Sequence, residues 1–197
     1  MKKYELTEET VTVYGKTLYR IRAVRDFGSV KTGEFGGYIE KEENLSHFGN
    51  AWISGDAWVY GNARVFGNAW VYGEVQVAGN AWVYGNAKVY GDARVSGDAW
   101  VYGNAWVYGN AWVYGNAEVF NTRHFFVQGP IGSRDGYVTF YRTKDDTIGV
   151  RCGCFSGSLQ KFVDRVEETH GGSRYEKEYK IAAELAKVCI RLEGESR

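Results

Sequence analysis

The sequence predicts a mainly β protein in which a solenoid of short stacked strands lies between an N-terminal β cap and a C-terminal α+β module. Residues 49–120 are twelve consecutive six-residue units with the consensus Gly-Asn-Ala-Trp-Val-Tyr and no insertion. Small or aliphatic residues alternate with larger ones in each unit, as a strand with one buried face requires. Because the composition changes at both ends of the repeat, we divide the chain into a cap (1–48), a repeat domain (49–120) and a C-terminal module (121–197).

The N-terminal cap is predicted to contain a β-hairpin, with strands from Val11 to Tyr14 and from Leu18 to Val24 around a turn at Gly15-Lys16. The ends of a solenoid need a covering segment, because each coil is otherwise covered only by its neighbours. We therefore expect residues 1–48 to cover the first coil. Residues 44–48 resemble a degenerate repeat unit.

Each repeat unit is predicted to form one strand and one corner. Gly always occupies the first position and Asn most often the second, and both accept the backbone angles of a tight corner. If Ala at position three and Val at position five point inward, the side chains at positions four and six point outward. One unit cannot bury its apolar face alone, so units must stack to close a core.

The repeat resembles the left-handed parallel β-helix built from hexapeptide repeats. Proteins of that family place three hexapeptides in each coil, with an aliphatic inward residue, a small inward residue two positions earlier and often Asn at the corner. The resemblance implies about four triangular coils, roughly 19 Å tall at about 4.8 Å per strand. It also implies a homo-oligomer, with a trimer as the expected form. A right-handed solenoid is the alternative.

With 18 residues per coil, residues 18 apart should stack on three outer faces. Position four carries Trp52, Trp70, Lys88 and Trp106 on the first face, Trp58, Gln76, Arg94 and Trp112 on the second, and Arg64, Trp82, Trp100 and Glu118 on the third. Monomers rarely expose large apolar patches, so we expect an oligomer interface. Its predicted residues are Trp70, Trp82, Trp100, Trp106, Tyr84 and Tyr102. Alternatively, the stacked rings only reinforce the sheets. The second face, interrupted by polar residues, should be the most solvated.

The C-terminal module is predicted to hold three strands followed by two helices. The strands are expected at residues 124–128, 137–142 and 147–152, with a Gly-rich turn at 129–134. Apolar residues at helical spacing predict helices at about 158–170 and 173–192. The second helix should bury Tyr175, Tyr179, Ala182, Leu185 and Cys189 on one face.

The sequence Cys152-Gly-Cys154-Phe155, with Thr169-His170-Gly171 further on, resembles the tail of short Gly-Asn-Ala-x-Val-Tyr repeat proteins encoded by phages and prophages. The N-terminal motifs Gly36-Gly37-Tyr38-Ile39 and Asn44-Leu45-Ser46 resemble the start of bacterial β-helix proteins. These resemblances imply a phage-encoded protein and carry no assigned chemistry.

The repeat lacks the groups that known β-helix activities use. Residues 49–120 contain no His, no loop insertion and no Thr. Acyl transfer needs a general base, a zinc enzyme needs His ligands, and ice binding would require outward Thr arrays. Cys152, Cys154, Cys189 and His170 could form a zinc site, but a single Cys-x-Cys is weak support. We predict no catalytic residues, no metal and no cofactor.

Anion binding is the more specific prediction for the C-terminal module. The Gly-rich turn offers backbone N–H groups, a hydroxyl and a guanidinium, which together suit phosphate. A second Gly- and Ser-rich segment precedes a predicted helix N-terminus. The candidate ligand residues are Gly132, Ser133, Arg134, Arg142, Arg151, Ser156 and Ser158. The alternative is a hairpin and a helix cap that serve only packing.

Composition limits the function further. The formal net charge is zero, with 24 basic and 24 acidic residues, which argues against a general nucleic-acid binder or an anionic-membrane binder. No apolar run long enough for a membrane helix or signal core is seen, and we expect a cytoplasmic protein, in the host cell if phage-encoded. The leading prediction is a non-enzymatic oligomer that sequesters a small anionic, nucleotide-like ligand such as a host defence signal. The alternatives are an assembly or protein-interaction module and an atypical hexapeptide acyltransferase.

Overall fold

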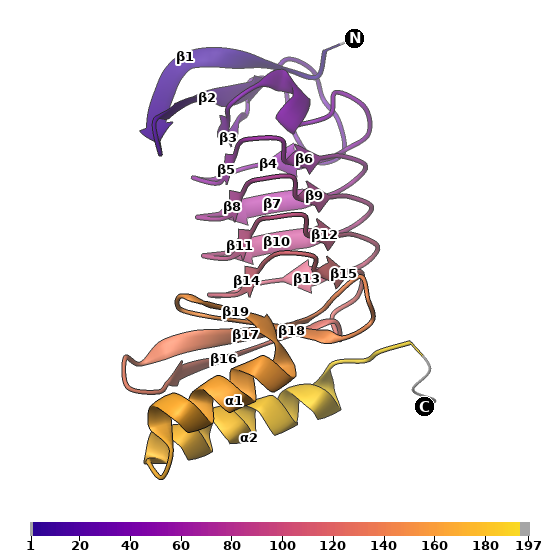
Figure 1. Cartoon of the computed structure of the whole chain (residues 1–197). Coiled ribbons are helices and arrows are strands. Elements are labelled where there is room, and N and C mark those ends of the chain that lie inside the picture. Colours follow the sequence, from indigo (N-terminus) through magenta and orange to yellow (C-terminus); the bar gives the residue numbers. More distant parts are fainter. Residues whose placement is uncertain (1, 194–197) are drawn as a thin grey trace.

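The computed structural model describes residues 2–193 as a column that is covered at both ends (Figure 1). A parallel β-solenoid forms the middle of the column. Antiparallel strands lie over its N-terminal end, and a four-stranded sheet with two helices lies beyond its C-terminal end. The predicted order of cap, solenoid and α+β module is present.

Short strands from successive repeat units stack into three parallel sheets. The first sheet contains β4 (Trp52–Ile53), β7 (Trp70–Gly73), β10 (Lys88–Gly91) and β13 (Trp106–Val107). The second contains β5 (Trp58–Val59), β8 (Gln76–Val77), β11 (Arg94–Val95) and β14 (Trp112–Val113). The third contains β6 (Arg64–Val65), β9 (Trp82–Val83), β12 (Trp100–Val101) and β15 (Glu118–Val119).

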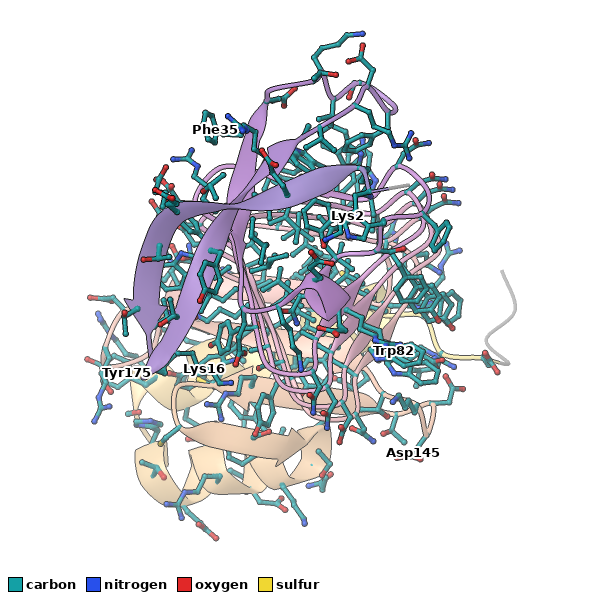
Figure 2. All side chains as sticks on the ribbon, turned by 90° about the horizontal axis from the view of Figure 1, so that it is seen from above. Lys2, Lys16, Phe35, Trp82, Asp145 and Tyr175 are labelled. Atoms are coloured by element: carbon teal, nitrogen blue, oxygen red, sulfur yellow. The ribbon has the colours of Figure 1, made fainter. Side chains whose placement is uncertain are left out.

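The register within these sheets is 18 residues, as the repeat predicts. Trp70 pairs with Trp52 on one side and with Lys88 on the other, and Trp82 pairs with Trp100. The three outer faces therefore carry the predicted residues. Figure 2, seen down the stack, shows the coils superposed and Trp82 on their outer side.

The solenoid core is built from the small inward residues of the repeat. Every residue at positions three and five, from Ala51 to Val119, is at most 1% exposed. Each buried Val contributes roughly 1.5–3 kcal/mol of hydrophobic stabilisation. Ala and Val with Ile53 therefore form a continuous buried core along the coils.

The corners of the coils are stabilised by side-chain ladders. Along one corner, each side-chain amide donates to the Asn side-chain oxygen one coil further on, at 3.2–3.3 Å. The residues of this ladder are Asn50, Asn68, Asn86 and Asn104. The repeat glycines have φ between 61° and 90°, the left-handed region that Gly adopts without strain. Both residues of the Gly-Asn pair therefore have a structural role in each coil.

Aromatic side chains at position six stack along two faces. Phe66, Tyr84 and Tyr102 have parallel rings 4.8–4.9 Å apart between centroids. Tyr72 and Tyr90 stack at 5.1 Å on the first face. In these ladders much of each ring's surface is in contact with other rings of the same chain.

The N-terminal segment extends one solenoid sheet. The hairpin of β1 (Tyr4–Val13) and β2 (Lys16–Ala23) pairs with β3 (Phe35–Ile39), which pairs in parallel with β5. A 3₁₀ turn (Glu42–Asn44) follows, and Leu45 then bridges in parallel to Val65. Residues 35–48 thus add to the coils of the repeat, which brings the solenoid to about five turns rather than about four. The predicted hairpin turn is present, but β1 begins at Tyr4 rather than Val11.

Lys3 lies buried where the cap meets the first coil. Its side chain is inaccessible to solvent, its Nζ donates to the Ala51 carbonyl at 2.6 Å, and it lies 4.9 Å from the Phe27 ring centroid. Burial and the neighbouring Arg25 charge lower the pKa of Lys3 from 10.5 to about 8. Within residues 2–193 no carboxylate pairs with this ammonium, so its charged form destabilises the fold at neutral pH.

Lys3→Met is expected to raise the free energy of unfolding at pH 7 by about 2 kcal/mol, because an apolar side chain replaces an unpaired buried charge. Between pH 8 and 10.5 the unfolded chain binds more protons at Lys3 than the folded chain, so the native protein gains stability as pH rises. The advantage of the variant should therefore shrink towards pH 10.5. Urea unfolding at several pH values measures this difference. A variant less stable than the native protein at pH 7 would show that the Ala51 and Phe27 contacts outweigh the buried charge.

The C-terminal module has four strands rather than the three predicted. They are β16 (Phe125–Ile131), β17 (Gly136–Arg142), β18 (Ile148–Cys152) and β19 (Phe155–Ser158), paired antiparallel in that order. Helix α1 (Leu159–His170) and helix α2 (Arg174–Cys189) follow. The fourth strand was missed because Phe-Ser-Gly-Ser has little apolar alternation.

Helix α2 buries only part of the face predicted for it. Ala182, Ala183, Ala186 and Ile190 are buried with Tyr179 partly buried beside them, whereas Leu185 is 43% exposed. Small side chains allow α2 to approach α1 and β16 closely. The sequence pattern was ambiguous because apolar residues lie on more than one side of this helix.

The module replaces the coil that would otherwise follow the last one. Thr139 Oγ1 accepts a hydrogen bond of 2.9 Å from the backbone N–H of Trp112, and Lys144 donates its backbone N–H to the Asn116 carbonyl at 3.0 Å. Lys144 Nζ also lies 4.0 Å from the Trp100 ring centroid. These contacts give hydrogen-bond partners to some of the backbone N–H and C=O groups at the open end of the solenoid. No helix among the described residues is long and apolar enough to cross a membrane.

Candidate ligand pocket

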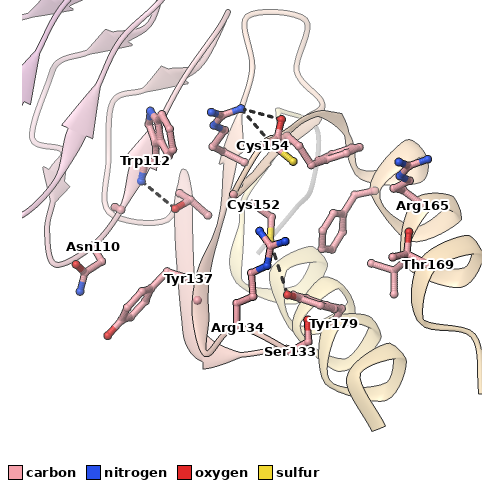
Figure 3. A pocket seen from close by; sticks show the side chains of 18 of the residues that line it. Asn110, Trp112, Ser133, Arg134, Tyr137, Cys152, Cys154, Arg165, Thr169 and Tyr179 are labelled. Atoms are coloured by element: carbon pink, nitrogen blue, oxygen red, sulfur yellow. Dashed lines mark hydrogen bonds between the residues drawn. The ribbon is translucent and has the colours of Figure 1, made fainter. Parts of the chain in front are cut away.

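A pocket of about 720 Å³ lies between the last coils of the solenoid and the C-terminal module (Figure 3). Its solenoid wall carries Arg94 and Trp112 from the second face, and its module wall comes from the β16–β17 turn, the β18–β19 hairpin and both helices. The volume is in the range of small-molecule sites, roughly 300–1,000 Å³. The second face was expected to be the most solvated, but its last coil is one wall of this pocket.

The register of two sheets brings Arg151 to Trp112. Arg151 lies on β18 opposite Thr139, and Thr139 is the residue that accepts the Trp112 backbone N–H. The Arg151 guanidinium consequently lies 3.9 Å from the Trp112 ring centroid and 5.1 Å from that of Tyr114. Arg94, one coil before Trp112, lies 5.4 Å from the same Trp112 ring. Stacking on aromatic rings holds an Arg side chain in a defined orientation.

One edge of the Arg151 guanidinium forms no hydrogen bond with the described residues. Its Nη1 donates to the carbonyls of Cys154 and Phe155 at 3.4 and 3.3 Å. Its Nε is buried and has no hydrogen-bond partner among the described residues. Nε and Nη2 share the edge that forms paired hydrogen bonds with carboxylate or phosphate oxygens. An anion bound there would supply the acceptor that Nε lacks.

The other end of the pocket is formed by the β16–β17 turn and the helices. Arg134 and Ser133 come from the turn, and Tyr179 comes from α2 (Figure 3). Burial and the nearby Cys152 raise the pKa of Tyr179 to about 12, so its hydroxyl is neutral at physiological pH. Burial also raises the pKa of the Cys152 thiol, which makes it a poor nucleophile.

Electrostatically, the pocket wall favours anions. Four arginines line it, against one carboxylate among the described lining residues, Asp92. Arg165 pairs with Glu168 across exposed α1 positions, whereas Arg134 makes no ion pair within residues 2–193. A cleft with charge of one sign raises the local concentration of oppositely charged ligands. The lining residues that were not among the predicted ligand residues include Asp92, Arg94, Trp112, Tyr137, Arg165 and Tyr179.

Three of the seven predicted ligand residues, Ser133, Arg134 and Arg151, line the pocket, and the other four lie elsewhere. Gly132 donates its N–H to Glu178 at 2.7 Å and contacts the Tyr179 hydroxyl, so its N–H is not free for an anion. The Ser158 hydroxyl accepts from the Lys161 N–H and caps α1. Ser156 lies opposite Arg151 on β19, outside the pocket lining.

Arg142 is also placed away from the pocket. It is 3% exposed and forms ion pairs with Glu118, Asp146 and Glu193. Because three carboxylates surround this guanidinium, it holds the module to the last coil instead of binding a ligand. Glu118 comes from the solenoid, which sequence spacing within the module could not reveal.

Four of the six residues predicted for an oligomer interface contact one another within the chain. Trp82 stacks on Trp100 at 5.6 Å, and Tyr84 stacks on Tyr102 at 4.9 Å. Trp70 lines a second, shallow pocket of about 460 Å³ on the first face. Trp106 remains 45% exposed. The stacked rings reinforce the sheets within the chain, and Trp106 is the most open of the six. The interface itself stays a prediction.

Among the described residues, no three or more His, Cys, Asp or Glu side chains lie together as a metal site would need. Cys152, Cys154 and Cys189 are free thiols.

Comparison with known proteins supports the solenoid. Residues 57–73, 87–103 and 99–115 match a family model described as the YdcK beta solenoid repeat. No curated protein matches the chain in sequence. The match covers parts of the repeat domain, so it describes the coils and does not extend to the pocket.

Proposed function

We propose that the protein is a non-enzymatic binding protein that holds a small anionic, nucleotide-like ligand in the pocket between the solenoid and the C-terminal module. The single observation that carries the proposal is the Arg151 guanidinium, stacked 3.9 Å from the Trp112 ring centroid with a buried and unpartnered Nε. A buried donor without an acceptor costs free energy that a bound oxyanion recovers. The preformed position of Arg151 also lowers the entropic cost of binding.

The chemistry of the pocket favours binding over catalysis. A general base or an activated nucleophile would need a positioned partner. The Cys152 thiol is kept protonated by burial, and its contact is the neutral Tyr179 hydroxyl at 4.0 Å. The lining provides four arginines, aromatic rings, neutral polar groups, the Asp92 carboxylate and the His170 imidazole, and the His170 ring lies 5.8 Å from the Tyr179 ring centroid.

Titration calorimetry with AMP and with pyrophosphate tests the proposal. Arg151→Gln is expected to weaken binding by at least about tenfold, since a charged paired hydrogen bond contributes roughly 1.5–3 kcal/mol. Arg151→Lys keeps the charge but loses the paired edge, and should also weaken binding. Arg64→Gln removes an exposed arginine of the repeat that lies outside the pocket lining and is the matched control. Equal affinities in all four proteins would contradict the proposal, as would no binding of either probe and no anion released from the purified protein.

We further propose that the hexapeptide coils wind left-handed and that the protein is a homotrimer. We also propose that it is of phage origin and acts in the host cytoplasm against a nucleotide defence signal. Their support is the repeat consensus and the Cys-Gly-Cys-Phe motif. Native mass spectrometry of protein purified from infected cells would measure the oligomer and identify any released ligand.

An assembly role is the second candidate, and one observation favours it. Trp106 and Tyr108 are each 45% exposed at the end of the first face. If this surface mediates assembly, Trp106→Ser should change the oligomeric mass while leaving anion binding unaltered.

A further inference from the structure

A second arginine of the pocket, Arg134, lies on the side away from Trp112. Arg134 lies in the turn between β16 and β17 and makes no hydrogen bond or ion pair with the described residues 2–193. Its positive charge lowers the pKa of Tyr179, in opposition to the larger effect of burial, so the two side chains are neighbours. Figure 3 shows Arg134 beside Tyr179, on the side of the pocket away from Trp112.

The strand register separates the two arginines. Arg151 pairs with Thr139, and Arg134 precedes the first residue of β17, Gly136. From Gly136 to Thr139 is three strand steps, or about 10 Å along β17. The stack on Trp112 keeps the Arg151 guanidinium at the solenoid end. The two arginines are therefore anchored at separate points along the sheet, and both line the pocket.

The wall between the two arginines is mostly uncharged. Cys152 and Phe155 come from the β18–β19 hairpin, and Phe162 comes from α1. Burial keeps the Cys152 thiol protonated. The middle of the pocket therefore suits the neutral body of an organic molecule, with charged groups at the two ends.

The charge and the donors of the lining both suit polyanions. Arg165 pairs with Glu168, so Arg94, Arg134 and Arg151 with Asp92 leave a formal charge of +2. Two carboxylates carry −2 and two phosphomonoesters about −3 to −4 at pH 7, so charge alone does not choose between them. Each phosphate presents three acceptor oxygens to the several donors of an arginine, and this is the ground for choosing phosphate.

We propose that the ligand of this pocket is a bisphosphorylated organic molecule, with one phosphate held by the Arg151 edge and the other by Arg134 from the β16–β17 turn. This inference rests on the proposed function and specifies its ligand class. It requires Arg134 to contribute only when the ligand carries a second phosphate.

Two probes that differ by one phosphate test this requirement, namely fructose 1,6-bisphosphate and fructose 6-phosphate, each titrated by calorimetry into the full chain. The native protein should bind the bisphosphate at least about tenfold more tightly than the monophosphate. Arg134→Gln should remove that difference and change the affinity for the monophosphate by no more than about twofold. Arg134 is exposed in a turn, so the variant is expected to fold.

The controls separate this inference from the proposed function. Arg151→Gln should weaken both probes, and Arg64→Gln should weaken neither. If Arg151→Gln weakens both probes but Arg134→Gln leaves their ratio unchanged, the two-phosphate inference is overturned and the anion site stands. If Arg151→Gln has no effect on either probe, or neither probe binds, the two-phosphate inference is overturned, and the AMP and pyrophosphate titrations then decide the proposed function.

Discussion

Gly97→Ala is expected to lower the free energy of unfolding by about 3–4 kcal/mol. Gly97 has φ +76°, and a Cβ there would lie 2.7 Å from the Gly115 nitrogen and 3.0 Å from its Cα. Left-handed backbone costs a residue with a side chain roughly 1–2 kcal/mol, and overpacking adds roughly 1–3 kcal/mol. The Gly115 backbone cannot easily move aside, because its carbonyl accepts the Asp98 N–H at 2.9 Å. Urea unfolding followed by tryptophan fluorescence measures the change.

Gly115→Ala is the matched control for this substitution. Gly115 has φ +66°, but a Cβ there would meet nothing within 4 Å because no coil follows on that side. The variant should lose only the backbone contribution, about 1–2 kcal/mol. Equal losses for the two variants would show that the approach of neighbouring coils does not require Gly, and that the corner angle alone selects it.

Arg142→Gln is expected to cost about 3–4 kcal/mol and to loosen the C-terminal module from the solenoid. The Arg142 guanidinium is buried between Glu118 of the last coil and Asp146 of the module, and it lies 5.1 Å from the Phe120 ring centroid. Removing one member of a buried ion pair leaves the opposite charge unpaired, which typically costs 3–5 kcal/mol. Hydrogen exchange should rise in residues 121–193 before it rises in the coils, because the lost pair joins those two parts.

A double-mutant cycle distinguishes the ion pair from simple loss of packing. Glu118→Gln with Arg142→Gln should cost less than the sum of the single changes, since no carboxylate of the last coil then lacks its partner. Additive losses would indicate that Arg142 acts through its contact with Phe120 and not through Glu118. Lys144→Gln, which removes an exposed contact to Trp100, should cost less than about 1 kcal/mol.

The solenoid was predictable because the sequence pattern that determines it is local and repeated. Each unit specifies its own strand and corner, and identical units fix the 18-residue register that Trp70 and Lys88 display. The beginning of the first turn was harder to see, because β3 has no repeat consensus and joins the coils only by pairing with β5.

The pocket could be predicted only in part, because some of its residues are brought together by contacts between distant parts of the chain. Ser133, Arg134 and Arg151 belong to one module, so their presence in one pocket follows from a short segment of chain. Arg94 and Trp112 enter the site only because the module docks against the last coils through Thr139. Arg142 was predicted as a ligand residue because its partner Glu118 lies in the solenoid, outside the module whose sequence suggested the site.

The regularity of the coils has a consequence for how the protein can change in length. Every layer of the core offers the next one the same Ala and Val surface, and the two ends alone are distinct. Removing or adding one 18-residue block would therefore preserve each interface and shift the two ends by one strand spacing, about 4.8 Å. The distance between the N-terminal hairpin and the arginine-lined pocket is thus a quantity that can evolve in fixed increments, by duplication or loss of whole turns, without redesign of either end.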